Sequence, residues 1–195
     1  GVVQKIFGLD FDGAAFKILL ALVPAVCDCA AAWLVAQLGQ RCLPDGRGVL
    51  CLTAFAALQP AALFDTAVWK QIDGAFTLPI LLCFLLLETK NYLPAAIFYG
   101  VALSIKPQAL LFGPVLAACF LAGIVLERDR LRAFGRCFAG AALAMLPVLA
   151  AGLPFFGLRG LLPGLLDKYA GTVSGYPYAS VNAFNWLAAL GGNWQ

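Results

Sequence analysis

Residues 14–38 read AAFKILLALVPAVCDCAAAWLVAQL, a run of 25 residues in which almost every side chain is apolar. An α-helix rises about 1.5 Å per residue, so this run is long enough to cross a hydrocarbon core of about 30 Å. Pro24 and Asp28 interrupt it near its middle. The run predicts a transmembrane helix that carries an acid inside the membrane.

The rest of the chain has the same character. Of its 195 residues, 63% are hydrophobic and 12% are charged, whereas soluble domains are about half apolar and about a quarter charged. A soluble domain of this composition could not cover its surface with polar groups. We therefore expect an all-α, polytopic transmembrane helix bundle, a multi-pass protein of the cell membrane. The net charge of +3 suggests no nucleic-acid partner.

The apolar runs divide the chain into about six expected spans within a single transmembrane domain, residues 1–195. We expect this chain to be an internal fragment of a longer protein. Residues 1–13 are expected to form an external N-terminal segment, and residues 158–195 an external loop and the start of a further span. The expected spans are residues 14–38, 49–60, 75–88, 93–105, 108–126 and 137–157.

The basic residues predict which loops lie inside. Loops 39–48, 88–92 and 127–136 hold seven of the 13 cations, namely Arg41, Arg47, Lys90, Arg128, Arg130, Arg132 and Arg136. Short loops rich in Lys and Arg stay in the cytoplasm. The polar stretch 59–74, the segment 106–108 and the two terminal segments are then expected to meet on the external face.

The cysteines and the absence of histidine limit the possible chemistry. The seven cysteines are odd in number and show no paired metal-binding spacing, and the chain has no histidine. A zinc site or a disulfide framework is therefore not expected, and acid–base chemistry falls to carboxylates. Asp10 and Asp12 form a D-x-D, but three residues match by chance too often to indicate a metal. We expect no metal and no cofactor.

The polar stretch 59–74, QPAALFDTAVWKQIDG, is the first candidate site. If it is helical, Asp65, Trp69 and Asp73 share one face at i, i+4 and i+8. Carboxylates beside a flat aromatic ring suit sugar hydroxyls. An exposed loop with an interfacial Trp explains the same residues, and both interpretations remain open.

Three further groups allow two interpretations each. Lys106, before Pro107 and Gln108, forms an anion site at a helix start or extends its charge to the membrane interface. Asp28 is a functional acid or a structural one that is hydrogen-bonded to another helix. In the C-terminal segment, Tyr178, Asn182 and Asn185 contact a sugar or headgroup, or belong to an interfacial aromatic belt. A belt does not explain the asparagines.

Three motifs occur in a fixed order: P-x4-D-x3-W-x-Q-x-D from Pro60 to Asp73, ALSIKPQALLFGP over residues 102–114, and YPYASVNAFNW over residues 176–186. Together they resemble the GT-C superfamily of membrane glycosyltransferases. The nearest likeness is to bacterial mannosyltransferase-type members, with a more distant one to the dolichyl-phosphate-glucose glucosyltransferases. One departure is Lys70, where the bacterial relatives usually have glycine.

The resemblance implies an inverting sugar transfer from a polyprenyl-phosphate carrier on the non-cytoplasmic face. The acceptor would be a lipid-linked glycan or a cell-envelope component. A membrane transporter or lipid carrier without transferase chemistry is the alternative. The main catalytic base is expected before Gly1, with Asp10 and Asp12 as weak candidates within the chain. The expected substrate-binding residues are Asp65, Trp69, Gln71, Asp73, Lys106, Gln108, Tyr178, Asn182 and Asn185.

Overall fold

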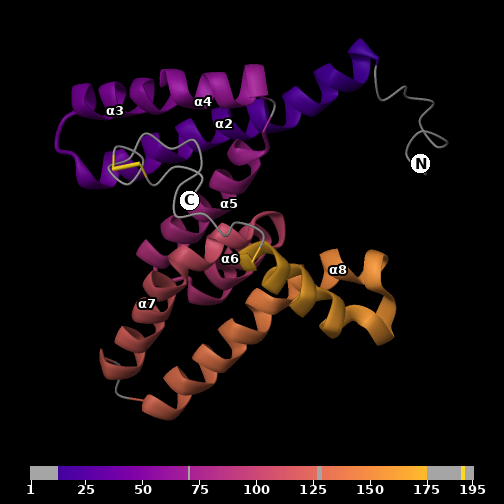
Figure 1. Ribbon diagram of the computed structural model, residues 1–195. Coiled ribbons are helices and arrows are strands. Elements are labelled where there is room, and N and C mark those ends of the chain that lie inside the picture. The colour runs from indigo at the N-terminus through magenta and orange to yellow at the C-terminus, as the bar shows by residue number, and fades with distance from the viewer. Residues whose placement is uncertain (1–12, 70, 127–128, 175–189, 192–195) are drawn as a thin grey trace. The chain divides into compact units, whose positions relative to one another are not determined.

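The computed structural model describes residues 13–69, 71–126, 129–174 and 190–191, and these residues form helices joined by short turns (Figure 1). No strand occurs among them, so the expected all-α fold is confirmed. The chain divides into two compact units, Gly1–Val148 and Leu149–Gln195, and each is described by itself. The single domain expected from the sequence stays a prediction.

The helices follow one another with few connecting residues. The π-helix η1 and the 3-10 helix η2 are short pieces between α-helices. The elements are α2 (Ala14–Cys42), α3 (Gly46–Leu58), α4 (Pro60–Phe64), η1 (Asp65–Trp69), α5 (Asp73–Glu88), α6 (Tyr92–Ile105), η2 (Pro107–Phe112), α7 (Gly113–Leu126) and α8 (Arg130–Ser174).

Within the described ranges, four helical stretches are long and apolar enough to cross a membrane, and α6 is a shorter apolar helix. The four stretches are Phe16–Cys42, Gly46–Trp69, Pro107–Leu126 and Arg130–Thr172. The expected count of about six spans stays a prediction. The stretch Gly46–Trp69 continues past residue 60, where the second span was expected to end. α3 ends before the extended residue Gln59, and a new helix, α4, starts directly after it with Pro60 in its first position.

α2 and α3 form an antiparallel hairpin. Asp45 caps α3, since its carboxylate accepts a hydrogen bond from the backbone N–H of Gly48 at 3.2 Å. Near the end of α2, a methyl group added at Gly39 would lie 3.4 Å from Leu52 and 3.6 Å from Val49 of α3. Small residues at such positions let two membrane helices approach closely.

α5 runs parallel to α2. At the start of α5, Gly74 packs against Asp28 in the middle of α2. At its end, Glu88 forms an ion pair with Arg41 in the last turn of α2. The two contacts are separated by nearly the same number of residues on both helices, so α2 and α5 pack in register over their length.

α6 returns antiparallel to α5 through a tight turn. Lys90 has a positive φ of 60° there, and the backbone N–H of Asn91 donates to the carbonyl of Leu86 at 2.8 Å. This geometry brings the end of α6, at Lys106, back to the start of α5, at Asp73.

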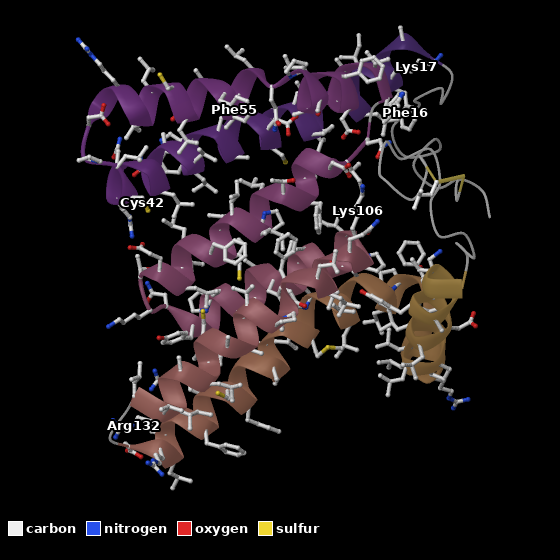
Figure 2. The ribbon with its side chains drawn as sticks, turned by 60° about the vertical axis from the view of Figure 1, so that its left-hand side comes forward. Phe16, Lys17, Cys42, Phe55, Lys106 and Arg132 are labelled. Atoms are coloured by element: carbon white, nitrogen blue, oxygen red, sulfur yellow. The ribbon has the colours of Figure 1, made fainter. Side chains whose placement is uncertain are left out.

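The core of the first unit lies mainly along α5 and α6, where small side chains are fully buried. A methyl group added at Gly100 of α6 would fall onto the carbonyl oxygen of Ala144 in α8, so the two backbones touch there. The outer helix α3 has no buried residue, and its Phe55, labelled in Figure 2, is 69% exposed. Such apolar exposure fits a surface that faces lipid. Buried residues of α5 and α6 include Ile80, Cys83, Ala95, Ala96 and Ala102.

In the second unit, residues 149–174 are helical on both sides of Gly157, whose φ of 63° and ψ of 172° redirect the chain. The segment expected as an external loop from residue 158 is helical as far as residue 174, and its external position stays a prediction. Leu161 and Leu165 pack against Gly152, each about 3.0 Å from a methyl group placed there. This packing holds a Gly- and Pro-containing segment in a helix.

Candidate functional site

The candidate site begins with an ion pair between Lys106 and Asp73. Lys106, labelled in Figure 2, lies between α6 and η2. Asp73 lies in the first turn of α5, where the partial positive charge of the helix N-terminus stabilises its carboxylate. Their side chains are 23% and 43% exposed, so both charged groups are accessible to a ligand.

A second polar contact lies beside this pair. The hydroxyl of Thr66, in η1, donates a hydrogen bond of 2.5 Å to the Oδ2 atom of Asp28 in α2. The other oxygen of Asp28 faces Gly74, the residue after Asp73. The two contacts join α2, η1 and the start of α5 at one point.

A cavity of about 240 Å³ opens among these elements. Three carboxylates, those of Asp28, Asp65 and Asp73, contribute to its wall, together with Gln59 and Thr66. Alanines of α2, α3 and α4 supply half of the remaining lining residues, and their small side chains leave the volume open. Ligand pockets range from about 300 to about 1,000 Å³, so this cavity suits a small polar group.

The level of the site along the helices follows from the packing of α2. Asp28 precedes Arg41 by thirteen residues, and both lie in α2, which corresponds to a rise of about 20 Å. The Asp73–Lys106 pair is therefore about 20 Å from the Arg41–Glu88 pair along α5 and α2.

The family model of glycosyltransferase family 87 matches residues 11–190. The chain belongs to glycosyltransferase family 87. The expected resemblance to GT-C membrane glycosyltransferases and the expected transferase activity are confirmed. No curated protein and no solved structure matches the chain.

For this family 87 chain, the expected approach of Asp73 to Lys106 is confirmed by their ion pair. The hydrogen bond expected between Asp28 and another helix is confirmed, since its carboxylate accepts from Thr66 of η1. Asp65 and Asp73 both line the cavity. Substrate binding by these residues stays a prediction.

The expected common face of Asp65, Trp69 and Asp73 is wrong. The π-helix ends at Trp69 and α5 starts at Asp73, while the backbone N–H of Gln71 bonds to the carbonyl of Asp65 at 3.1 Å. A π-turn changes the helical phase, so an i, i+4, i+8 series no longer holds. Trp69 is 64% exposed, packs edge-on against Phe64 and lies outside the cavity lining.

The groups expected to form an anion site after Lys106 already have partners in the structure. The ammonium of Lys106 is already paired with Asp73. The N–H of Ala109 bonds to the carbonyl of Lys106 at 3.1 Å, and Pro107 has no N–H to offer. The ammonium is thus the main cationic donor at this point, and Gln108 lies exposed beside it.

Sequence reasoning missed Thr66 and Gly74. Each follows an acid that was identified, but a threonine and a glycine carry no signal of their own in an apolar chain. Tyr178, Asn182, Asn185, Asp10 and Asp12 lie outside the described residues, as does Lys70. All seven cysteines are free thiols.

Proposed function

We propose that this family 87 enzyme transfers a sugar, with inversion, from a polyprenyl-phosphate carrier to an acceptor on the non-cytoplasmic face of the cell membrane. The observation that supports this most directly is the Asp73–Lys106 pair beside a cavity with three carboxylates. A polyprenyl-phosphate sugar presents a phosphate and several hydroxyls next to each other. The site offers a cation for the first and acceptors for the second.

The ammonium of Lys106 can bind the phosphate while it keeps its ion pair with Asp73. A lysine ammonium carries three N–H donors, and both side chains of the pair are partly exposed. Asp73, Asp65 and Gln59 then supply oxygens to the sugar hydroxyls from the cavity wall. None of these carboxylates is proposed as the catalytic base.

The level of the site favours a lipid-linked donor over a water-soluble one. If the Arg41–Glu88 pair marks one boundary of a core about 30 Å thick, the Asp73–Lys106 pair lies about 10 Å below the other boundary. A carrier lipid moves laterally in the membrane and can enter a site at this level from the bilayer. By the positive-inside rule, the basic end is cytoplasmic and the site faces the other side.

An apolar cavity that begins at Gly113, seven residues after Lys106, supports a carrier with a hydrocarbon chain. Its volume is about 440 Å³, and α6, α7 and the first part of α8 line it. Gly113 and Leu116, which follow Lys106 along the chain, belong to its wall. If the phosphate of a lipid binds at Lys106, its hydrocarbon chain could contact this cavity, which starts about two helical turns further along the protein chain.

The test compares two donors in membranes that contain the protein. A polyprenyl-phosphate mannose is supplied first, then the nucleotide sugar of the same hexose, with lipid-linked glycan as acceptor. We expect transfer from the lipid-linked donor only, and a loss of about tenfold or more in Asp73→Asn and Lys106→Ala, as for charged groups that contact substrate. Asp129→Asn and Lys168→Ala, at exposed positions, are the matched controls. Transfer from the nucleotide sugar alone, or unchanged rates in both site variants, would contradict the proposal.

A further inference from the structure

Asp28 contacts both η1 and the start of α5, the helix that carries Asp73. Its Oδ2 atom accepts the hydrogen bond from Thr66 of η1. Its Oδ1 atom lies against Gly74 of α5, so close that a methyl group there would overlap it. Asp28 itself stands in the middle of the long helix α2. The acid therefore fixes the distance between α2, η1 and the start of α5.

The start of α5 needs such a contact. Its N-cap residue, Ile72, makes no side-chain hydrogen bond to the helix. The first turn of a helix carries partial positive charge from unpaired N–H groups, which a nearby carboxylate stabilises. Asp73 lies in this turn, but its carboxylate also engages Lys106. Asp28 supplies a second carboxylate to the same helix end from outside the helix.

Thr66 completes the arrangement from the other side. It is buried, with 8% of its surface exposed, and its hydroxyl gives the intramembrane acid a donor. An acid in an apolar medium without a partner is costly, so the hydrogen bond favours one rotamer of Asp28. η1 is a π-helix, a form that often marks functional sites.

We propose that Asp28 is a positioning residue for sugar transfer, which holds the start of α5 so that Asp73 meets Lys106 at the cavity. This inference rests on the proposed role of the Asp73–Lys106 pair in binding the donor. Asp28 acts through Gly74 and Thr66. A misplacement of the bound donor by about 1 Å costs about a hundredfold in rate, which sets the size of the expected effect.

The first part of the test replaces Thr66 by valine, which removes the hydroxyl group and keeps the shape of the side chain. Thr66→Val is expected to lower kcat/KM for the lipid-linked donor by about tenfold to a hundredfold, mainly through a higher KM, and Thr66→Ser to restore it. Thr53→Val is the matched control, because Thr53 is half-buried in α3 and its hydroxyl bonds to its own helix at Val49, 2.8 Å away. Rates are expressed per mole of protein that unfolds cooperatively in detergent.

The second part separates positioning from a general structural role. Asp28→Asn and Asp28→Ala are each combined with Lys106→Ala. If Asp28 acts through the pair, its substitution lowers kcat/KM in the wild-type background and adds little in the Lys106→Ala background. Effects that multiply in the double variants, or a Thr66→Val variant as active as Thr53→Val, overturn the positioning role and leave the donor site intact. An unchanged kcat/KM in Lys106→Ala alone overturns the donor site and the positioning role with it.

Discussion

Gly74→Ala is the substitution that tests the packing beneath the site most sharply. The added methyl group would lie 2.7 Å from the carbonyl oxygen of Pro24 and 2.8 Å from the Cγ atom of Asp28. Ordinary contacts of such atoms begin at about 3.5 Å, so α2 and α5 must separate by about 1 Å. Overpacking of this kind costs about 1–3 kcal/mol of stability. The same shift displaces the neighbouring Asp73 and lowers the transfer rate by about a hundredfold.

Two measurements check this prediction: thermal unfolding in detergent and the transfer rate per mole of folded protein. Gly135→Ala in α8 is the matched control, because a methyl group there meets nothing within 4 Å. Alanine is favoured over glycine in a helix by about 0.5–1 kcal/mol, so the control should be as stable as the wild type or more so. A Gly74→Ala protein with wild-type stability and rate would refute the close α2–α5 contact.

Three further substitutions test the rest of the fold. Arg41→Ala should change the stability by no more than about 1 kcal/mol, because its ion pair with Glu88 is solvent-exposed; chemical denaturation at two salt concentrations would measure this. Gly100→Ala should destabilise the protein by about 3 kcal/mol, because the methyl group would strike the backbone of Ala144, and a thermal midpoint close to the wild-type value would argue against that contact. Gly157→Ala should cost about 1–3 kcal/mol, because its φ of 63° and ψ of 172° suit glycine; protease sensitivity of the second unit would report it, and an unchanged cleavage pattern would speak against the redirected helix.

Most of the helical architecture follows from the apolar runs of the sequence. Polar turns at 43–45 and 89–91 separate runs that are hydrophobic on all sides, and such runs form helices in an apolar solvent. α6, for example, begins at Tyr92 and ends at Ile105, within one residue of the expected range. The helix after Gly157 was missed because Gly and Pro are common in transmembrane helices as well as in loops.

The candidate site was predictable only in part. Asp73 and Lys106 could be placed together, because both lie at the same expected side of the membrane and both are charged in an apolar chain. The contact of Gly74 with Asp28 depends on how two helices pack across 46 positions of sequence, which no local pattern encodes. The π-turn at 65–69 was likewise missed, since its phase change leaves the composition of the segment unaltered.

In the proposed function, Lys106 holds the phosphate of a lipid-linked donor. Binding of radiolabelled polyprenyl phosphate to the purified protein in detergent tests it without dependence on the acceptor. We expect saturable binding that Lys106→Ala weakens by about tenfold, the loss expected for one charge-assisted contact of about 1.4 kcal/mol, while Lys168→Ala leaves it unchanged. Equal affinity of the wild type and Lys106→Ala for polyprenyl phosphate would contradict it.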